Sequence, residues 1–355
     1  MNITIIGTGN IGTAISADLI KKGHKVSLLK TSDKSSGAHY SVLKNSKKIE
    51  LIEDGESCFE ELTNVTTDVA AAMASAETVI LAVQTAYHKS VIHRIAPYIK
   101  DGQTFIIVPG YLSTCYFLQE TQRNITIIEA ESSPIDCRIT GPGRVKALFR
   151  NVLNPVGVFP LENREKAKQV LDGLQFPYTF TRNVLEAALH NPNLIVHTVG
   201  AVFSIPRIEY SKGKYSMYRE VFTPHVWNMV EALDQEKINV LKKAGCVSLP
   251  YVEACKQRNS TDKDSDAKAV FFDYANNSAP DGPSVPDSRY VMEDVPQGLV
   301  MLESLGVILG VKTPVCTGLI NLAAAAMKKD FREEGRTIDK LGRNNIMNIL
   351  DRKDI

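Results

Sequence analysis

Side chains able to bind and move protons are concentrated in residues 288–296, which read Ser-Arg-Tyr-Val-Met-Glu-Asp-Val-Pro. Arg289 carries a planar guanidinium, which can grip a carboxylate through two parallel hydrogen bonds. Asp294 stands just before Pro296, and an acid ahead of a first-turn proline is also typical of a helix start. Asp294 therefore has two interpretations, as a helix cap or as part of a catalytic site.

A histidine that could pair with this acid lies in an apolar segment, Asn193 to Phe203. Asn191 and a following proline are typical of a helix start, and a helix that is apolar on all faces is buried. Asn193 and His197 are four residues apart and share one face, so they can act on one ligand. His197 alone could be a core histidine, but a carboxylate from Asp294 would fix its tautomer for proton transfer. His190 precedes the helix, and we expect it to be less enclosed.

A glycine motif opens the chain, directly after the β-branched run Asn2 to Ile6. The residues are Gly7, Thr8, Gly9, Asn10, Ile11 and Gly12, and helical spacing follows as far as Gly23. A strand, these glycines and a helix in this order form the dinucleotide-binding fingerprint, in which free helix N–H groups bind the pyrophosphate. A glycine turn that binds no ligand is the alternative.

The choice of coenzyme depends on the end of the next strand-like run, Lys25 to Leu29. An acid usually stands there and bonds the ribose hydroxyl of NAD. This chain has Lys30, Thr31 and Ser32 instead, and a cation with two hydroxyls suits a 2′-phosphate. We therefore expect NADP to be preferred and NAD to be possible; alternatively Lys30 is a solvated strand end and Asp33 binds the ribose.

The elements that must position these residues alternate between strand and helix in the first half. Strand-like runs are Thr78 to Val83, Thr104 to Val108, Ile125 to Glu129 and Val156 to Phe159, with helical spacing at Tyr87 to Ile99 and Arg164 to Leu174. This alternation predicts a Rossmann-type, doubly wound parallel sheet, with ligands at the carboxyl ends of the strands. Gln84, Thr85, Pro109 and Gly110 should then lie near the coenzyme. We expect this dinucleotide-binding domain to span residues 1–182.

The pattern becomes helical from Asn183 onward, which predicts an all-α substrate domain over residues 183–355. Helices are expected from Thr223-Pro224 to Gly245, after Pro296 to about Leu309, and from Pro314. Residues 256–287 are polar, and we expect a long loop there, of the kind that serves as a lid, with at most a short helix near residues 267–272.

Composition excludes several classes of protein. The 355 residues are 44% apolar and 23% charged, and 41 basic against 40 acidic residues give a net charge of +1 without a basic stripe, which argues against a nucleic-acid partner. The six cysteines have no metal-binding spacing and indicate reduced thiols. No apolar run approaches the ~18 residues of a membrane span, and Met1 leads directly into a strand-like run. We expect a cytoplasmic protein without a signal peptide or a metal.

The chain resembles the octopine and nopaline dehydrogenase family, the opine dehydrogenases, over nearly its whole length. The resemblance rests on the Gly7 to Gly12 fingerprint, Ser133 to Arg138 (Ser-Pro-Ile-Asp-Cys-Arg), the Asn193 to His197 helix, Arg289 to Pro296, and Asp330 through Gly335-Arg336-Thr337 to Gly342. It implies NAD(P)-dependent joining of an amino acid amine to a 2-oxo acid, with reduction of the imine. It also implies that His197 and Asp294 are the catalytic pair and that Arg289, with Asn193, binds substrate.

Three departures leave the substrate pair open: Thr198 stands where the family often has proline, Tyr218 to Val221 lacks a common glycine, and Lys30 replaces an acid. A homodimer is kept as a candidate assembly. Two other functions remain as alternatives. One is a reductase of a hydroxy acid or ketone, although such enzymes usually need a lysine that Asn193 to Ile205 lacks. The other is a non-catalytic NADP-sensing protein.

Overall fold

The computed structural model describes residues 1–32, 37–277, 279 and 281–351. Contacts between Cα atoms divide the chain into two compact units: unit 1 is Met1–Val184, and unit 2 begins at Leu185.

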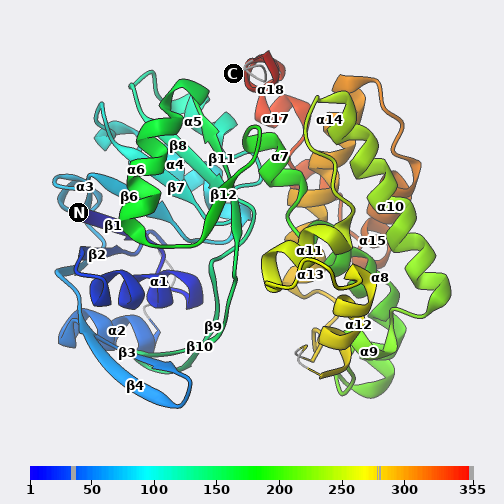
Figure 1. Cartoon of the computed structure of the whole chain (residues 1–355), viewed down its shortest axis with the longest axis horizontal. Helices are drawn as coiled ribbons and strands as arrows, with labels where there is room; N and C mark the ends of the chain where they lie inside the picture. Colours follow the sequence, from blue (N-terminus) through cyan, green and yellow to red (C-terminus); the bar gives the residue numbers. More distant parts are fainter. Residues whose placement is uncertain (33–36, 278, 280, 352–355) are drawn as a thin grey trace. The chain divides into compact units, whose positions relative to one another are not determined.

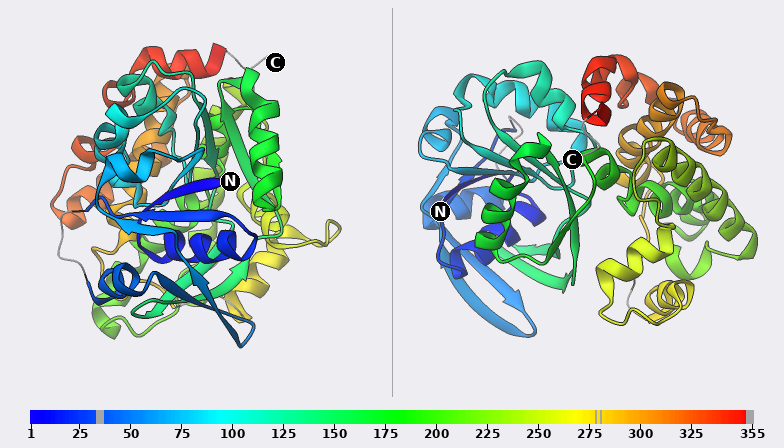
Figure 2. Two further views of the ribbon diagram at one scale, coloured as in Figure 1. Left: turned by 90° about the vertical axis from the view of Figure 1, so that its left-hand side faces the viewer. Right: turned by 45° about the horizontal axis from the view of Figure 1, so that its top comes forward.

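Unit 1 is built on an eight-stranded sheet with the order β12-β11-β8-β7-β6-β1-β2-β5 (Figures 1 and 2). Its strands are β1 (Asn2–Ile6), β2 (Lys25–Leu29), β5 (Asn64–Thr66), β6 (Thr78–Leu81), β7 (Thr104–Ile107), β8 (Thr126–Ala130), β11 (Asn154–Phe159) and β12 (Tyr178–Phe180). The strands from β5 to β8 are parallel, and the chain order reverses at β1, which confirms the Rossmann-type prediction. β11 continues the sheet antiparallel to β8.

The helices of unit 1 follow the expected alternation. They are α1 (Asn10–Lys21), α2 (Ala38–Ser46), α3 (Val69–Met73), α4 (His88–Ile95), α5 (Thr114–Glu120) and α6 (Arg164–Leu174), with short 3-10 turns at Thr85–Tyr87, Ala96–Tyr98 and Leu161–Asn163.

A second sheet, which the sequence did not lead us to expect, has the order β4-β3-β10-β9. Its strands are β3 (Lys48–Glu53), β4 (Glu56–Glu61), β9 (Ile135–Gly141) and β10 (Arg144–Arg150). The alternating burial along β9 shows why it forms a strand, because every second side chain at its start turns into the core. The Ser133 to Arg138 motif leads into β9.

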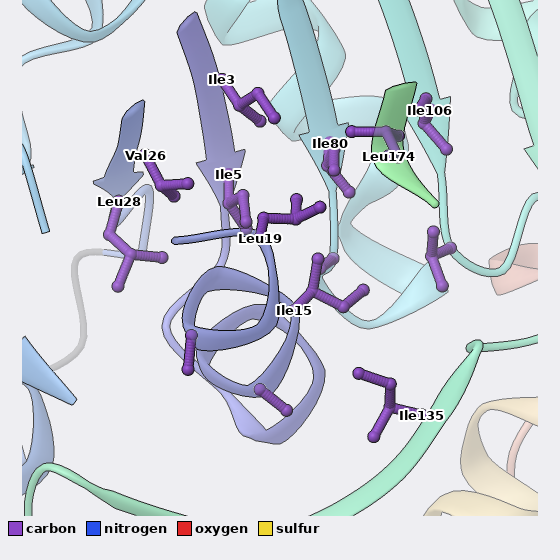
Figure 3. Packing of buried hydrophobic residues seen from close by; sticks show 14 of the residues in the cluster. Ile3, Ile5, Ile15, Leu19, Val26, Leu28, Ile80, Ile106, Ile135 and Leu174 are labelled. Carbon is purple, nitrogen blue, oxygen red and sulfur yellow. The ribbon is translucent and has the colours of Figure 1, made fainter. Parts of the chain in front are cut away.

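Helix α1 packs against both β1 and this second sheet. Figure 3 shows the packing, with Ile15 and Leu19 of α1 directed toward Ile5 of the first sheet and Ile135 of β9 close by. Burying each such side chain contributes about 1.5–3 kcal/mol. The core therefore fixes the helix whose N-terminus follows the glycine motif.

The regular elements of unit 2 are all helical among its described residues, as expected. Its helices are α7 (Val184–Leu189), which starts at the unit boundary, α8 (Asn193–Ser211), α9 (Met217–Glu220), α10 (Pro224–Lys243), α11 (Tyr251–Asn259), α12 (Ala267–Asn277), α13 (Arg289–Met292), α14 (Val300–Leu309), α15 (Pro314–Met327), α16 (Phe331–Glu334), α17 (Ile338–Leu341) and α18 (Arg343–Asp351). A π-helical turn, η4 (Val295–Leu299), joins α13 to α14. The long helices α8 and α10 pack against each other (Figure 1).

The polar segment of residues 256–287 is more helical than we expected. Helix α12 continues to Asn277, because Tyr274 packs edge-on against Tyr218 at a ring-centroid distance of 5.6 Å and Ala275 is buried. Tertiary packing thus stabilises a longer helix than the polar sequence predicted. No helix in the described ranges has both the length and the apolar character needed to cross a bilayer.

Candidate active site

His197 lies on the second turn of α8. The helix begins where we expected, since Asn191 Oδ1 accepts a hydrogen bond from the backbone N–H of Asn193 at 2.9 Å and Pro192 directly precedes the first helical residue. The helix is buried over most of its first half, and His197 is 9% exposed. Asn193 lies one turn earlier and is partly exposed.

The structure brings His197 and Asp294 together. His197 Nδ1–H donates to Asp294 Oδ2 at 2.8 Å, and the carboxylate is 1% exposed. The side chain of Asp294 makes no capping hydrogen bond to the following turn, so the helix-cap interpretation is wrong. Because Nδ1 holds the proton of this bond, the neutral ring keeps Nε2 as the nitrogen that can accept a proton.

The π-helical turn η4 determines where Asp294 points. Pro296 lies in its first turn, and the carbonyl oxygen of Pro296 accepts from the backbone N–H of Arg336 at 3.0 Å. The side chain of Arg336, which is fully buried, also donates from Nε to Gln297 Oε1 at 2.8 Å. The motif at Gly335-Arg336 is therefore attached to the turn that follows Asp294.

Two neighbours of the dyad come from α13. The ring of Tyr290 lies flat on the His197 imidazole, with 3.6 Å between ring centroids and 6° between ring planes. The side chain of Arg289 is 52% exposed, and its Nε lies 3.4 Å from Oε2 of the buried Glu293. The guanidinium is thus held by an acid one turn away while remaining accessible to a solvent-borne carboxylate. The sequence alone did not assign roles to Tyr290 and Glu293, although both lie within residues 288–296, which contain Arg289 and Asp294.

His190 is enclosed, contrary to our expectation. It is 6% exposed, its Nε2–H donates to the Val247 carbonyl at 2.9 Å, and Nδ1 is buried with no hydrogen-bond partner among the described residues. Burial, together with the positive charge of Lys237, lowers the pKa of His190 to about 4. Tertiary packing decides this and not the local sequence pattern, because Val247 and Lys237 come from a distant part of the chain.

The glycine motif has the shape of a dinucleotide-binding loop. Gly7 has φ +123°, and a Cβ there would lie 2.4 Å from the Ala82 carbonyl oxygen. A Cβ on Gly12 would meet the Gly7 carbonyl oxygen at 1.9 Å, whereas a Cβ on Gly9 would have nothing within 4 Å. The first and third glycines are therefore needed for the tight turn and the helix packing. The space at Gly9 fits the approach of a pyrophosphate to the backbone.

The remaining residues of the loop also have defined positions. Thr8, which precedes α1, and Asn10 and Ile11, which begin it, are partly exposed. The side-chain oxygen of Asn10 accepts from the backbone N–H of Ile139 at 2.8 Å, which attaches the loop to β9.

Lys30 is more buried than we expected of a lysine that binds a phosphate. It is 9% exposed, its ammonium donates to the Ser32 carbonyl, and it lies 5.5 Å from the ring of Tyr40. A second cation reaches the same segment, because Nη1 of the exposed Arg94, on α4, donates to the Thr31 carbonyl at 2.6 Å. Sequence reasoning missed Arg94, since its distance along the chain gave no signal. Asp33 lies outside the described residues.

Gln84, Thr85, Pro109 and Gly110 follow the carboxyl ends of β6 and β7, as expected.

An additional residue, Glu129, holds the loop after β7. It is fully buried, and its carboxylate accepts the backbone N–H groups of Leu112 at 2.7 Å and Thr114 at 2.6 Å. The sequence signal that could have identified this role is an acid, Glu129, in an otherwise uncharged and buried strand.

The described residues contain no cluster of three or more His, Cys, Asp or Glu side chains that could hold a metal ion. The six cysteines are free thiols, and burial raises the pKa of Cys137 to about 12, so its thiolate is disfavoured at neutral pH.

Two family models match the chain. The one described as NAD/NADP octopine/nopaline dehydrogenase, alpha-helical domain, matches residues 181–327. The one described as NAD-dependent glycerol-3-phosphate dehydrogenase N-terminus matches residues 2–142. The helical match includes His197, Arg289 and Asp294.

Known proteins resemble the chain over almost its full length. An opine dehydrogenase of Arthrobacter sp. (strain 1C) is 28% identical, over 95% of this chain and 94% of its own. Octopine dehydrogenase in complex with NADH and agmatine shares the fold with a TM-score of 0.78 at 18% identity, over 99% of this chain and 97% of its own. NADP⁺-bound yersinopine dehydrogenase gives 0.74 at 15% identity, over 99% and 98%. Together, the match of the helical unit and the similarity to opine dehydrogenases over nearly the whole chain support the assignment of this chain to the opine dehydrogenase family.

Proposed function

We propose that the chain is an opine dehydrogenase-type oxidoreductase. It condenses the amine of an amino acid with the carbonyl of a 2-oxo acid, reduces the imine with NAD(P)H, and catalyses the reverse oxidation. The observation that carries this proposal is the buried hydrogen bond between His197 and Asp294 beside Arg289, in the unit that matches the helical domain of the family. Relatives in complex with NADH and either L-arginine or pyruvate support this substrate class.

Proton transfer is the task of His197. When the amine attacks the carbonyl carbon and the imine forms, the nitrogen loses two protons in all, and the carbonyl oxygen gains two and leaves as water. A group that alternates between donor and acceptor near neutral pH can perform both steps, and imidazole is the side chain suited to this. Asp294 fixes the tautomer and stabilises the ring when it carries a second proton.

Substrate orientation is the task of Arg289 and Asn193. Both substrates carry a carboxylate, and the accessible guanidinium of Arg289 can bind one of them bidentately. Glu293 holds this guanidinium through an ion pair of 3.4 Å between its Oε2 and Arg289 Nε. Asn193 shares a face of α8 with His197 and offers an amide to the same ligand.

The coenzyme is NAD or NADP, and residues 7–12, with the N-terminus of α1, would hold its pyrophosphate. When bound, the nicotinamide supplies the hydride that reduces the imine. We propose a preference for NADPH, supported by Lys30, Thr31, Ser32 and the neighbouring guanidinium of Arg94. Gln84 and Pro109 are proposed to line the nicotinamide end, because they follow the carboxyl ends of the strands.

We assign coenzyme binding to residues 1–182 and substrate binding to residues 183–355. The six free cysteines suit a reducing compartment, so we place the enzyme in the cytoplasm and in amino acid metabolism. A homodimer is the assembly to test first, by light scattering.

A matrix assay tests the function. Oxidation of NADPH and NADH is followed with amino acids paired with pyruvate, glyoxylate or 2-oxoglutarate. We expect oxidation only when both an amine and an oxo acid are present, and faster oxidation of NADPH. Oxidation with the oxo acid alone would identify a ketone reductase instead. Coenzyme binding without oxidation in any mixture would identify an NADP-sensing protein, and a strong NADH preference would contradict the proposed role of Lys30.

A further inference from the structure

Tyr290 has no role in the chemistry described so far, yet its ring makes the closest aromatic contact of the site. Helix α13 packs against α8 (Figure 1), and this places Tyr290 flat on one face of the His197 ring, at 3.6 Å and 6°. Arg289 is the adjacent residue on the same turn. One helical turn therefore delivers both the group that would bind a substrate carboxylate and the group that covers the imidazole.

Full face-to-face overlap is not the arrangement that two neutral rings prefer, because their quadrupoles then repel. The backbones of α8 and α13 must therefore impose it. The contact becomes attractive when the imidazole carries a second proton, since a cation is drawn to the face of an aromatic ring. Such a protonated ring occurs in every cycle of a histidine that transfers protons.

Two contacts together define the direction of the reactive nitrogen. The hydrogen bond from Nδ1 to Asp294 fixes the orientation of the His197 ring within its plane, and the stacked Tyr290 ring fixes the plane itself. The remaining nitrogen, Nε2, has no partner among the described residues. The lone pair of Nε2 lies in the ring plane, so a substrate exchanges a proton with it along the direction that these two contacts fix.

We propose that Tyr290 is a positioning residue, whose ring face holds the His197 imidazole in the plane that aims Nε2 at the substrate. This inference rests on the proposed role of His197 in proton transfer. It requires the aromatic ring of Tyr290 and not its hydroxyl group. It also places carboxylate binding beside proton transfer, because Arg289 and Tyr290 are adjacent residues of α13.

Three variants separate the ring from the hydroxyl and from general packing. Tyr290→Phe keeps the stacked ring, and Tyr290→Leu removes it. Tyr274→Leu is the matched control, because Tyr274 packs edge-on against Tyr218 in the same unit at a centroid distance of 5.6 Å. We expect Tyr290→Leu to lower kcat by about tenfold, the magnitude of an aromatic contact, with little change in KM. Tyr290→Phe and Tyr274→Leu should keep the wild-type kcat.

Nuclear magnetic resonance of the histidine ring protons reads the contact without any substrate. The Hε1 resonance of His197, assigned with His197→Ala, should be shielded by the Tyr290 ring in the wild type and in Tyr290→Phe. It should lose this shielding in Tyr290→Leu. Equal kcat in Tyr290→Leu and wild type, or an equal loss in Tyr290→Phe and Tyr290→Leu, would overturn the proposal. If no substrate pair is turned over, the proposed function fails, and an unchanged resonance in Tyr290→Leu would independently refute the stacking.

Discussion

At the scale of single residues, Asp294 shows how one position can satisfy a sequence pattern and serve another purpose. An acid before Pro296 has the appearance of a helix start, but the turn that follows is π-helical and the carboxylate bonds His197 instead. A buried acid needs a hydrogen-bond partner, and the imidazole provides it.

Asp294→Asn tests this assignment. An amide can occupy the same space, but it neither fixes the tautomer nor stabilises a doubly protonated imidazole. We expect kcat to fall by about 10²- to 10⁴-fold, the usual contribution of acid–base catalysis, while the protein remains folded. If activity survives and only about 1 kcal/mol of stability is lost, the hydrogen bond from His197 to Asp294 is structural and not catalytic.

His190 provides a prediction on pH and stability. Its pKa is about 4 in the folded protein and ordinarily 6.5, so below pH 6.5 the unfolded chain binds a proton that the folded chain does not. The contribution of neutral His190 to the free energy of unfolding is complete above pH 6.5 and is lost as the pH falls towards 4. The loss is about 3 kcal/mol in total and about 2 kcal/mol by pH 5.

The test compares His190→Gln with the wild type in denaturant at pH 7.5 and pH 5. Glutamine can still donate to the Val247 carbonyl but does not titrate. We expect the loss of stability between the two pH values to be smaller by about 2 kcal/mol in the variant. The single tryptophan, Trp227, lies in unit 2, so its fluorescence follows the unit that contains His190. Equal pH dependence in both proteins would show that His190 does not titrate in this way.

At the scale of elements, the turn η4 depends on a segment far along the chain. A Cβ on Gly335 would lie 2.7 Å from the Pro296 carbonyl oxygen and 2.7 Å from Val300 Cβ. The absence of a side chain at Gly335 therefore allows the C-terminal segment to pack against the turn that carries Asp294.

Gly335→Ala should push this segment away from η4. We expect a loss of about 1–3 kcal/mol in stability from overpacking, and roughly tenfold lower kcat if Asp294 moves with the turn. Gly318→Ala is the matched control, because a Cβ on Gly318 meets nothing within 4 Å on helix α15. The control should be neutral or slightly more stable. Normal kcat in a destabilised Gly335→Ala protein would separate the packing of η4 from catalysis.

At the scale of the whole molecule, the two proposed tasks reside in different units. The glycine motif is in unit 1, and the His197–Asp294 pair is in unit 2. We expect His197→Ala to abolish turnover while its dissociation constant for NADPH, measured by fluorescence titration, stays at the wild-type value. Retained turnover would refute the role of His197, and lost coenzyme binding would show that the tasks are not separable.

The sequence by itself determined the features that are local or periodic. The glycine motif, the strands of the large sheet other than β5 and β12, the limits of α6 and α10, and the helical second unit follow from turn residues and apolar spacing, which act over a few neighbouring residues. Asn191, Pro192 and the apolar run likewise placed His197 on a buried helix. The pairing of His197 with Asp294 could be inferred because the residue types require each other and the family resemblance joined the two segments.

Only the tertiary structure decided the features made by segments distant in sequence. These are the second sheet around α1, the full length of α12, the burial of His190, the approach of Arg94 to Thr31, and the stacking of Tyr290 on His197. Their common cause is physical, because side-chain packing and hydrogen bonds act over a few ångströms in space, whatever the separation along the chain. The sequence therefore identified Asp294 and His197 as the acid and the base, and the tertiary structure decided how the His197 ring is held.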